Sequence, residues 1–190
     1  MKRSTVIKCV VSALVLVPTV VFASDFIKQD RCLDNGGVWF GTLGCIRSMP
    51  PIDRIVIDKS ERQLRAYSKG AIVRRLPVSL GRDPEGPKQQ EGDNRTPEGV
   101  YPLTEHKRDS GYHLALRVGY PTPGEAVVAQ RQDREPGSDI MIHGLRNGFG
   151  WIGTVHRSVD WTRGCIALTN GEMEWLYRST SAHTVVEITA

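Results

Sequence analysis

The chain has 190 residues, a formal net charge of +4 at pH 7 and an isoelectric point near 9.0. A basic balance can indicate a nucleic-acid partner, but residues 1–23 hold three of the 25 basic residues and none of the 21 acidic ones. Without that segment the net charge falls to about +1, and no lysine- or arginine-rich run replaces it. We therefore expect no nucleic-acid partner.

Residues 1–23 have the pattern of a secretory signal peptide. A basic start precedes the apolar run of residues 9–22, and the small residue Ala23 provides a cleavage point before Ser24. The apolar run is too short and wrongly flanked for a stable membrane span, although an uncleaved N-terminal anchor is an alternative. We therefore expect an exported, periplasmic protein without a membrane span in its mature form.

Three cysteines follow the expected signal peptide: Cys32, Cys45 and Cys165. An oxidising compartment favours pairing, and an odd count leaves one thiol over. Cys32 and Cys45 bracket a short segment rich in Asn and Gly, which a disulfide would stabilise by about 3 kcal/mol in the chain-entropy model; two free thiols in a linker are the alternative. We expect a segment over residues 24–51 stapled by Cys32–Cys45. Cys165 is then unpaired, and either catalytic or simply buried.

From Ile52 onward, short apolar stretches alternate with polar turns, as in a β-rich domain. The expected strands in this part are residues 52–57, 63–67 and 71–80. Residues 81–99 contain four glycines and three prolines, so we expect an irregular and functional loop there. Residues 100–103 follow as a strand, and Pro102 favours an edge position for it.

The second half of the chain continues this pattern and adds one helix. Further strands are expected at residues 112–118, 125–129, 140–142 and 184–188. Thr169 and Glu172 form a capping box ahead of apolar residues at helical spacing, which predicts a helix over residues 170–178. We therefore predict a mainly β fold, a mixed β-sandwich with one or two short helices packed against it.

Two chemically active side chains lie at the ends of apolar strand patterns. Residues 140–142 lead into His143 and Gly144, and Cys165 stands before another apolar run. A free thiol, with a pKa of about 8.5, is only a few per cent ionised at neutral pH, and an imidazole can activate it by forming an ion pair. Gly164 allows close approach of the backbone to a substrate, and the amides of residues 163–165 could form an oxyanion hole.

Two other interpretations of these residues are possible. His156 could replace His143 as the base, although it lacks a preceding strand and an adjacent glycine. His143, His156 and Cys165 could instead bind zinc, although no closely spaced pair of ligands is present. We therefore expect neither a metal nor a cofactor.

Several motifs in order resemble the L,D-transpeptidase catalytic domain family (YkuD-like). Its pattern is a strand ending in His-Gly, a spacer, then Ser/Thr-x-Gly-Cys and an apolar residue; this chain has His143-Gly144 and Thr162-Arg163-Gly164-Cys165-Ile166. Residues 92–101, GDNRTPEGVY, are similar to the family's Gly-Asp-x-x-Thr-Pro-x-Gly-x-Tyr segment, and residues 80–82 and 86–88 also match. The resemblance covers roughly residues 52–188, within an expected catalytic domain of residues 52–190.

The resemblance implies that Cys165 is the nucleophile and His143 the general base and acid. The group that orients His143 would be the Gly144 carbonyl or Thr162, and Gly164 would support the oxyanion. Many members carry histidine where this chain has Arg163, which would either bind a substrate carboxylate or point to solvent.

The implied reaction uses peptidoglycan tetrapeptide stems as donor. Cys165 would release the terminal D-alanine and form a thioester, which an amine acceptor would resolve in transpeptidation. Water as acceptor would make the protein an L,D-carboxypeptidase or a hydrolase of such linkages. A cell-wall-binding module without turnover is a further alternative. The enzyme would act in cell wall organisation and cell shape.

Overall fold

The computed structural model describes residues 38–40, 44–46 and 49–190, and the chain divides into two compact units, residues 1–49 and 50–190. In the first unit, β1 (Val38–Phe40) pairs with β2 (Gly44–Ile46) in antiparallel register. The expected signal peptide and Cys32 lie outside the described residues. Both the cleavage before Ser24 and the Cys32–Cys45 disulfide therefore remain predictions.

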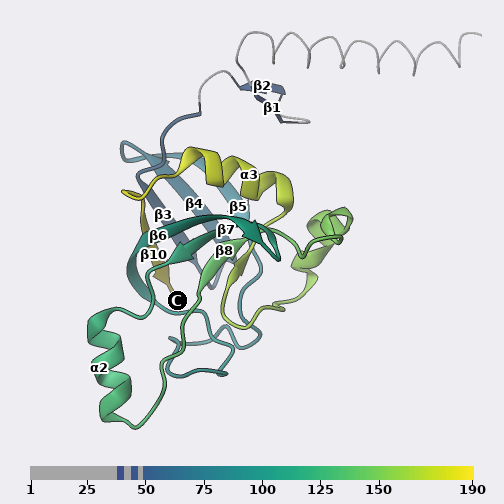
Figure 1. Ribbon diagram of the computed structural model, residues 1–190. Helices are drawn as coiled ribbons and strands as arrows, with labels where there is room; N and C mark the ends of the chain where they lie inside the picture. The colour runs from purple at the N-terminus through teal and green to yellow at the C-terminus, as the bar shows by residue number, and fades with distance from the viewer. Residues whose placement is uncertain (1–37, 41–43, 47–48) are drawn as a thin grey trace, which may run out of the picture. The chain divides into compact units, whose positions relative to one another are not determined.

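The second unit is built on one mixed eight-stranded sheet with the strand order β5-β4-β3-β10-β6-β7-β8-β9. Its strands are β3 (Arg54–Asp58), β4 (Gln63–Ser68), β5 (Ala71–Pro77), β6 (Gly99–Ser110), β7 (His113–Val118), β8 (Met141–His143), β9 (Ile166–Ala167) and β10 (Val185–Thr189). The pairs β3–β10 and β8–β9 are parallel, and the other neighbours are antiparallel. The sheet curls, so that β3–β5 lie behind β6–β8 in Figure 1. The predicted mainly β, mixed fold class is confirmed, with the layers of the expected sandwich formed by one curled sheet.

Strand alternation places one face of the curled sheet in the core. In β4, for example, Leu64 and Ala66 are fully buried while their neighbours are partly exposed, as the two-residue period of a strand requires. Helix α3 (Asn170–Ser179) packs against β7, and its buried residues include Met173 and Leu176. Burying each such side chain contributes about 1.5–3 kcal/mol. The capping box of Thr169 and Glu172 is present, so the predicted helix is confirmed.

The strand expected at residues 125–129 is wrong, because this segment is the helix α2 (Pro123–Arg131). Thr122 caps it, Pro123 stands in its first turn, and Glu125 completes a second capping box. The β-branched pair Val127 and Val128 suggested a strand, but both side chains are largely exposed on the helix surface. With η2 (Gly150–Ser158), a 3-10 segment, the described residues contain three short helices, where one or two were expected.

The edge position expected for the strand with Pro102 is also wrong. β6 is an interior strand, paired with β10 on one side and β7 on the other. In an antiparallel pair, the nitrogen and the carbonyl of one residue point to the same side. The carbonyl of Pro102 accepts from the amide of Gly119, so the nitrogen of Pro102 also points towards β7. Gly119 lies one residue beyond Val118, where β7 ends. The missing N–H therefore removes no bond of the ladder, and the proline is tolerated in an interior strand.

Candidate active site

The register of β8 and β9 brings His143 and Cys165 together, although they are 22 residues apart in the sequence. The two strands are parallel, with Ile142 opposite Ile166 and His143 opposite Ala167. Cys165 precedes β9 by one residue, so this register continues to place it beside Met141. Since alternate residues share a face, His143 and Cys165 lie on the same face as diagonal neighbours, with Cα atoms about 8 Å apart from strand spacing and rise.

His143 is buried, with 5% of its surface exposed, and its ring orientation is fixed. Nδ1 lies 2.6 Å from the Gly144 carbonyl oxygen, which can only accept, so Nδ1 carries the proton. Nε2 therefore has a free lone pair with which to take a proton. Thr162, the other candidate for orienting His143, instead donates to the Cys165 carbonyl at 2.7 Å and accepts from the Gly164 amide at 3.1 Å. Of the two candidates, the Gly144 carbonyl holds the imidazole, and Thr162 holds the turn before Cys165.

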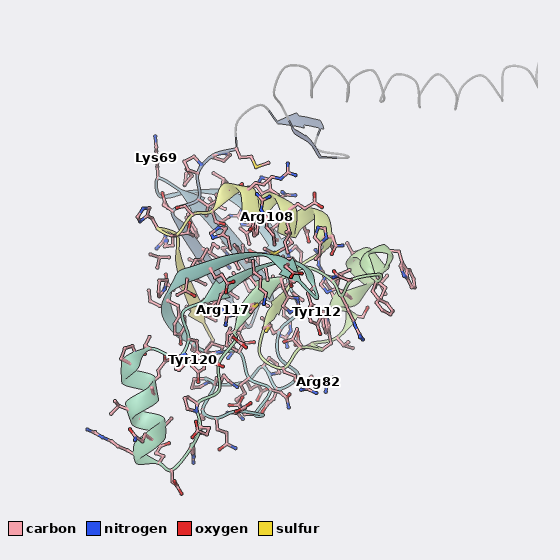
Figure 2. The ribbon with its side chains drawn as sticks, in the orientation of Figure 1. Lys69, Arg82, Arg108, Tyr112, Arg117 and Tyr120 are labelled. Atoms are coloured by element: carbon pink, nitrogen blue, oxygen red, sulfur yellow. The ribbon has the colours of Figure 1, made fainter. Side chains whose placement is uncertain are left out.

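Two aromatic rings contact the imidazole of His143, and neither residue was selected from the sequence. The Tyr112 ring is tilted 4.6 Å from His143, and the Trp161 ring meets it edge-on at 5.8 Å. Tyr112 lies in the turn between β6 and β7 (Figure 2), and Trp161 directly precedes the Thr-x-Gly-Cys segment. Large aromatic residues in turns beside a catalytic motif were a usable signal, since loops carry functional residues on a rigid scaffold.

The thiol and the imidazole both lie in surroundings that disfavour charge. Burial raises the pKa of the Cys165 thiol, opposed by a backbone hydrogen bond from Met141 and by the charge of Lys88. Burial lowers the pKa of His143, opposed by the bond to Gly144. Sγ donates to the Asp139 carbonyl at 3.5 Å. Both directions favour the neutral thiol and the neutral imidazole over the ion pair.

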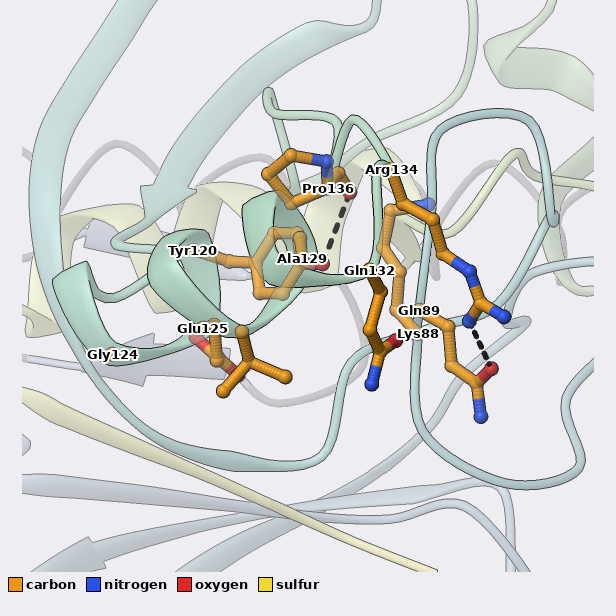
Figure 3. A pocket seen from close by; sticks show the side chains of 10 residues that line it. Lys88, Gln89, Tyr120, Gly124, Glu125, Ala129, Gln132, Arg134 and Pro136 are labelled. Carbon is orange, nitrogen blue, oxygen red and sulfur yellow. Dashed lines mark hydrogen bonds between the residues drawn. The ribbon is translucent and has the colours of Figure 1, made fainter.

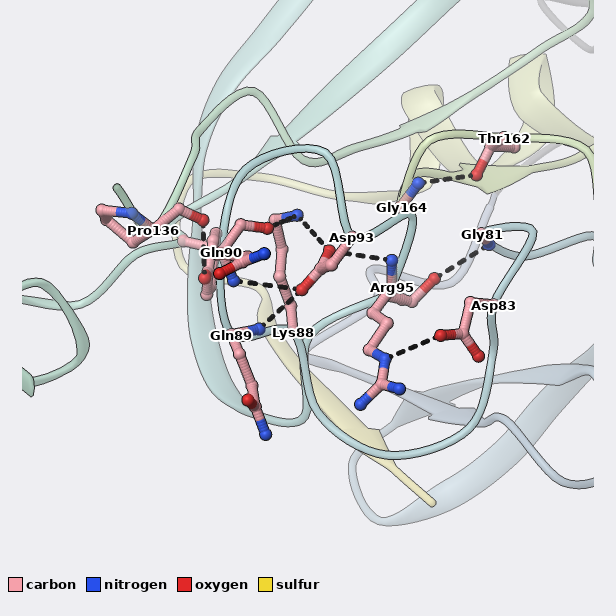
Figure 4. A network of polar contacts seen from close by, with 12 residues as sticks. Gly81, Asp83, Lys88, Gln89, Gln90, Asp93, Arg95, Pro136, Thr162 and Gly164 are labelled. Carbon is pink, nitrogen blue, oxygen red and sulfur yellow. Dashed lines mark hydrogen bonds and ion pairs between the residues drawn. The ribbon is translucent and has the colours of Figure 1, made fainter. Parts of the chain in front are cut away.

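The loop of residues 81–99 forms a wall of the candidate site, against the segment that carries Cys165. The Thr162 amide donates to the Leu80 carbonyl and the Thr162 carbonyl accepts from the Arg82 amide, both at 3.1 Å. Gly164 has φ +123°, and a Cβ there would lie 2.6 Å from the Arg95 carbonyl oxygen, so no other residue fits. The contact between this loop and the segment that precedes Cys165 is visible in Figure 4.

The remaining predicted supporting residues have distinct positions. The Gly164 amide is engaged by Thr162, so an oxyanion hole in this segment would use the amides of Arg163 and Cys165. The Arg163 side chain is exposed, two residues before Cys165 in the sequence. A guanidinium at this place is available to bind a carboxylate.

His156, the alternative base, is buried behind Trp161. Its Nδ1 lies 3.3 Å from Ser79 Oγ and 3.4 Å from Trp161 Nε1, and burial together with the charge of Arg157 lowers its pKa to about 4. An imidazole with so low a pKa is a weak base. In the described part of the chain, no group of three or more His, Cys, Asp or Glu side chains is arranged to hold a metal ion.

Two cavities are lined by residues of the loop of residues 81–99 and of the segment that ends at Trp161. One of about 670 Å³ lies between α2 and the loop of residues 81–99, and Lys88, Tyr120, Glu125 and Arg134 are among its lining residues (Figure 3). The other, of about 360 Å³, is mainly apolar, and it is lined by residues that include Leu145, Phe149, Val155 and Trp161.

The model of the L,D-transpeptidase catalytic domain (YkuD) matches residues 52–188, so this chain belongs to that family, as its motifs predicted. The chain is 26% identical over 166 residues to the Escherichia coli (strain K12) protein named "Putative L,D-transpeptidase YafK", a match that covers 78% of this chain and 58% of YafK. No helix among the described residues is long and apolar enough to cross a bilayer.

Solved structures share the fold. A variant of the helical cell shape determining protein Pgp2 from Campylobacter jejuni aligns with a TM-score of 0.55 and 26% identity, covering 72% of this chain and 46% of Pgp2. Bd1075 from Bdellovibrio bacteriovorus aligns with a TM-score of 0.51 and 23% identity, covering 75% of this chain and 52% of Bd1075. This chain therefore spans 58% or less of the length of each of these three relatives.

Proposed function

We propose that this protein is a cysteine-dependent L,D-transpeptidase that acts on peptidoglycan stem peptides. The observation that carries the proposal is the geometry of one pair: the sheet register puts Cys165 on the same face as a buried His143, as its diagonal neighbour, and the Nδ1 of His143 is held by Gly144. The Nε2 lone pair is then free to accept the thiol proton. Membership of the L,D-transpeptidase family supplies the reaction class.

In the first half-reaction, Nε2 of His143 takes the proton of Cys165 as the sulfur attacks the carbonyl of the third stem residue, a diamino acid. The C–S bond forms, and in this scheme the amides of Arg163 and Cys165 stabilise the oxyanion. The imidazolium then gives its proton to the D-alanine nitrogen, the C–N bond breaks, and D-alanine leaves. The pKa directions of Cys165 and His143 suit this scheme, in which the proton moves only as the attack takes place.

The second half-reaction resolves the thioester. An amine acceptor loses a proton to His143 and attacks the acyl carbon, and the sulfur leaves and is reprotonated. An amide between two stems or between a stem and another amine results. Water in place of the amine yields a shortened stem, so the same site would then be an L,D-carboxypeptidase or a hydrolase.

The setting of this activity is also proposed. The pattern of residues 1–23 supports export to the periplasm, where peptidoglycan stems are accessible. Intact-mass analysis of the exported protein should find an N-terminus at Ser24. The structural relative Pgp2 is described as a helical cell shape determining protein, which supports a role in cell wall organisation and cell shape.

Incubation with tetrapeptide muropeptides, with and without an added amine, tests the proposal. Release of D-alanine is expected in both arms, with an amine-linked product in the first. Cys165→Ala should abolish release, and His143→Gln should slow it about 10²–10⁴-fold, the usual contribution of a general base. His183→Gln, at an exposed turn residue, is the matched control.

The outcomes separate the candidate functions. If shortened stems appear without an amine-linked product, the protein is a hydrolase and not a transferase. Absence of D-alanine release, together with absence of a carbapenem adduct on Cys165, would rule out the enzyme and favour a wall-binding module without turnover.

A further inference from the structure

The peptide bond between Gly144 and Leu145 connects the imidazole of His143 to the first residue of helix α3. Its carbonyl oxygen lies 2.6 Å from His143 Nδ1 and accepts the proton that Nδ1 carries. Its N–H donates to Oδ1 of Asn170 at 2.9 Å. A peptide unit is planar, so its carbonyl and its N–H point in opposite directions and turn together. The side-chain amide of Asn170 therefore fixes the direction of the bond that holds the imidazole.

The preceding peptide bond, between His143 and Gly144, is held by the sheet. The Gly144 amide donates to the Leu114 carbonyl at 3.1 Å, and the His143 carbonyl accepts from the Leu168 amide at 2.9 Å. The chain leaves β8 at this point, and the torsions of a glycine restrain the next peptide less than those of any other residue. The sheet thus fixes the backbone of His143, whereas the peptide that orients its ring is held by a side chain.

Asn170 is closely packed in this position. The site of a Gly144 Cβ lies 2.9 Å from its Oδ1, and the site of a Gly150 Cβ lies 2.6 Å from its Nδ2, so a methyl group at either glycine would be too close to the amide. The end of β8, the start of η2 and the start of α3 therefore meet at one side chain. Leu145 is only 3% exposed, so without Oδ1 of Asn170 its N–H would lose a bond that water is poorly placed to replace.

We propose that Asn170 is a positioning residue for the general base: by holding the peptide after Gly144, it keeps the proton of His143 on Nδ1 and leaves Nε2 free to take the proton of the thiol. This inference rests on the proposed roles of His143 and Cys165 in the reaction. A neutral imidazole can carry its proton on either nitrogen, and the hydrogen bond made at one nitrogen decides which tautomer is present. Two hydrogen bonds linked through one peptide also polarise and strengthen each other.

Three substitutions of Asn170 separate the acceptor oxygen from the shape of the side chain. Asn170→Asp keeps an oxygen at the place of Oδ1. Asn170→Leu keeps the same branched skeleton without an acceptor, and Asn170→Ala removes both the acceptor and the packing. If the hydrogen bond orients the imidazole, the tautomer of His143 should follow the oxygen. If packing alone orients it, Asn170→Leu should resemble the unmodified chain.

NMR of the protein labelled with ¹⁵N at histidine measures this tautomer, because protonated and unprotonated ring nitrogens have distinct resonances. Of the five histidines in the chain, His143 is the one whose signals disappear in His143→Gln. At pH 7 the unmodified chain and Asn170→Asp should carry the proton on Nδ1. Asn170→Leu and Asn170→Ala should move towards an average of the two tautomers. Their kcat for D-alanine release should fall about ten- to hundredfold with little change in KM, because the base and not stem binding is affected.

Thr169→Ala is the matched control, because it weakens the start of the same helix at the preceding residue. The hydroxyl of Thr169 donates to Glu172 Oε2 at 2.6 Å as part of the capping box, so this variant should lose stability without removing the acceptor of the Leu145 amide. We expect it to keep the proton of His143 on Nδ1. An equal change of tautomer in Thr169→Ala and Asn170→Ala would reduce Asn170 to a residue that stabilises the start of α3, and would overturn the inference.

Two further results would refute the inference. A proton that stays on Nδ1 in both Asn170→Leu and Asn170→Ala would mean that the Gly144 carbonyl holds the imidazole without Asn170. A proton on Nε2 in the unmodified chain would contradict the hydrogen bond from which the inference starts. The NMR measurement needs no stem peptide, so it is independent of the proposed function. If the tautomer follows the oxygen but the unmodified chain releases no D-alanine, the proposed function alone has failed.

Discussion

At the scale of single residues, the site is defined by a few contacts that leave little freedom. The imidazole of His143 is fixed by the Gly144 carbonyl and by two aromatic rings. The sequence identified His143 and Cys165 because each adjoins a glycine at the end of an apolar stretch. Tyr112 and Trp161 were candidates as large aromatic residues in turns, but their contact with His143 depends on how the turns fold back on the sheet, which no local pattern specifies.

Gly164 is the residue where a minimal change should be most harmful. In Gly164→Ala the new Cβ would meet the Arg95 carbonyl oxygen at 2.6 Å, and φ +123° is strained for alanine. We expect a loss of about 1–3 kcal/mol in the free energy of unfolding, together with slower acylation of Cys165. Urea unfolding followed by fluorescence would measure the first effect.

Gly171→Ala is the control for this substitution. Gly171 lies in the first turn of α3, and nothing approaches its Cβ site within 4 Å. Alanine should be neutral there or stabilise by up to about 1 kcal/mol. If both variants lost the same stability, the close approach of Arg95 to Gly164 would not be the cause.

At the scale of elements, both α-helices begin with a capping box, but only one of them could be predicted from the sequence. Thr169 to Glu172 and Thr122 to Glu125 are both capping boxes. For α3, buried Met173 and Leu176 follow at helical spacing, so capping and periodicity agree. For α2, the β-branched pair Val127–Val128 pointed to a strand, and α2 buries only Ala129. Because α2 has so little apolar periodicity, its capping box was the one sequence pattern that could have predicted it.

Because α2 buries so little, its cap should contribute a large part of its stability. Glu125 accepts from the Thr122 amide at 2.7 Å and from the Tyr101 hydroxyl at 2.7 Å, which ties the start of α2 to β6. Thr122→Ala removes the hydroxyl that accepts from the Glu125 amide and should cost about 1 kcal/mol. Equilibrium urea unfolding would detect this loss.

Gln130→Ala, an exposed change in the last turn of the same helix, is the comparison for Thr122→Ala. It should alter the free energy of unfolding by less than about 0.5 kcal/mol, as surface substitutions usually do. A Thr122→Ala variant as stable as this control would show that the capping box does not hold α2 in place.

At the scale of the whole domain, the site forms where segments distant in sequence converge on one end of the curled sheet. β8 supplies His143, the segment before β9 supplies Cys165, and the loop of residues 81–99 packs against the segment that carries Cys165. The sequence predicted most of the strands and the long loop, because their patterns are local. The order of strands, including the parallel pair β8–β9 that aligns the two reactive residues, depends on long-range pairing that no local pattern specifies.

Burial of two histidines in this convergent region should make the stability of the domain depend on pH. Burial lowers the pKa of His143, and it lowers that of His156 to about 4. Well above pH 6.5, the pKa of histidine in the unfolded chain, both residues are neutral in the folded and in the unfolded state. Stability then does not depend on pH through them. As the pH falls below 6.5, the unfolded chain takes up protons that the folded chain does not. Stability should therefore fall steadily from pH 6.5 towards pH 4.

Urea unfolding at pH 7 and pH 5 would measure this loss, and His156→Gln isolates one contribution. Glutamine cannot be protonated, so the stability difference between the two pH values should shrink in this variant even if its stability at pH 7 is lower. His183→Gln, at an exposed turn position, should keep the full difference. A difference unchanged in His156→Gln would mean that His156 is protonated as readily in the folded domain as in the unfolded chain, contrary to its burial behind Trp161.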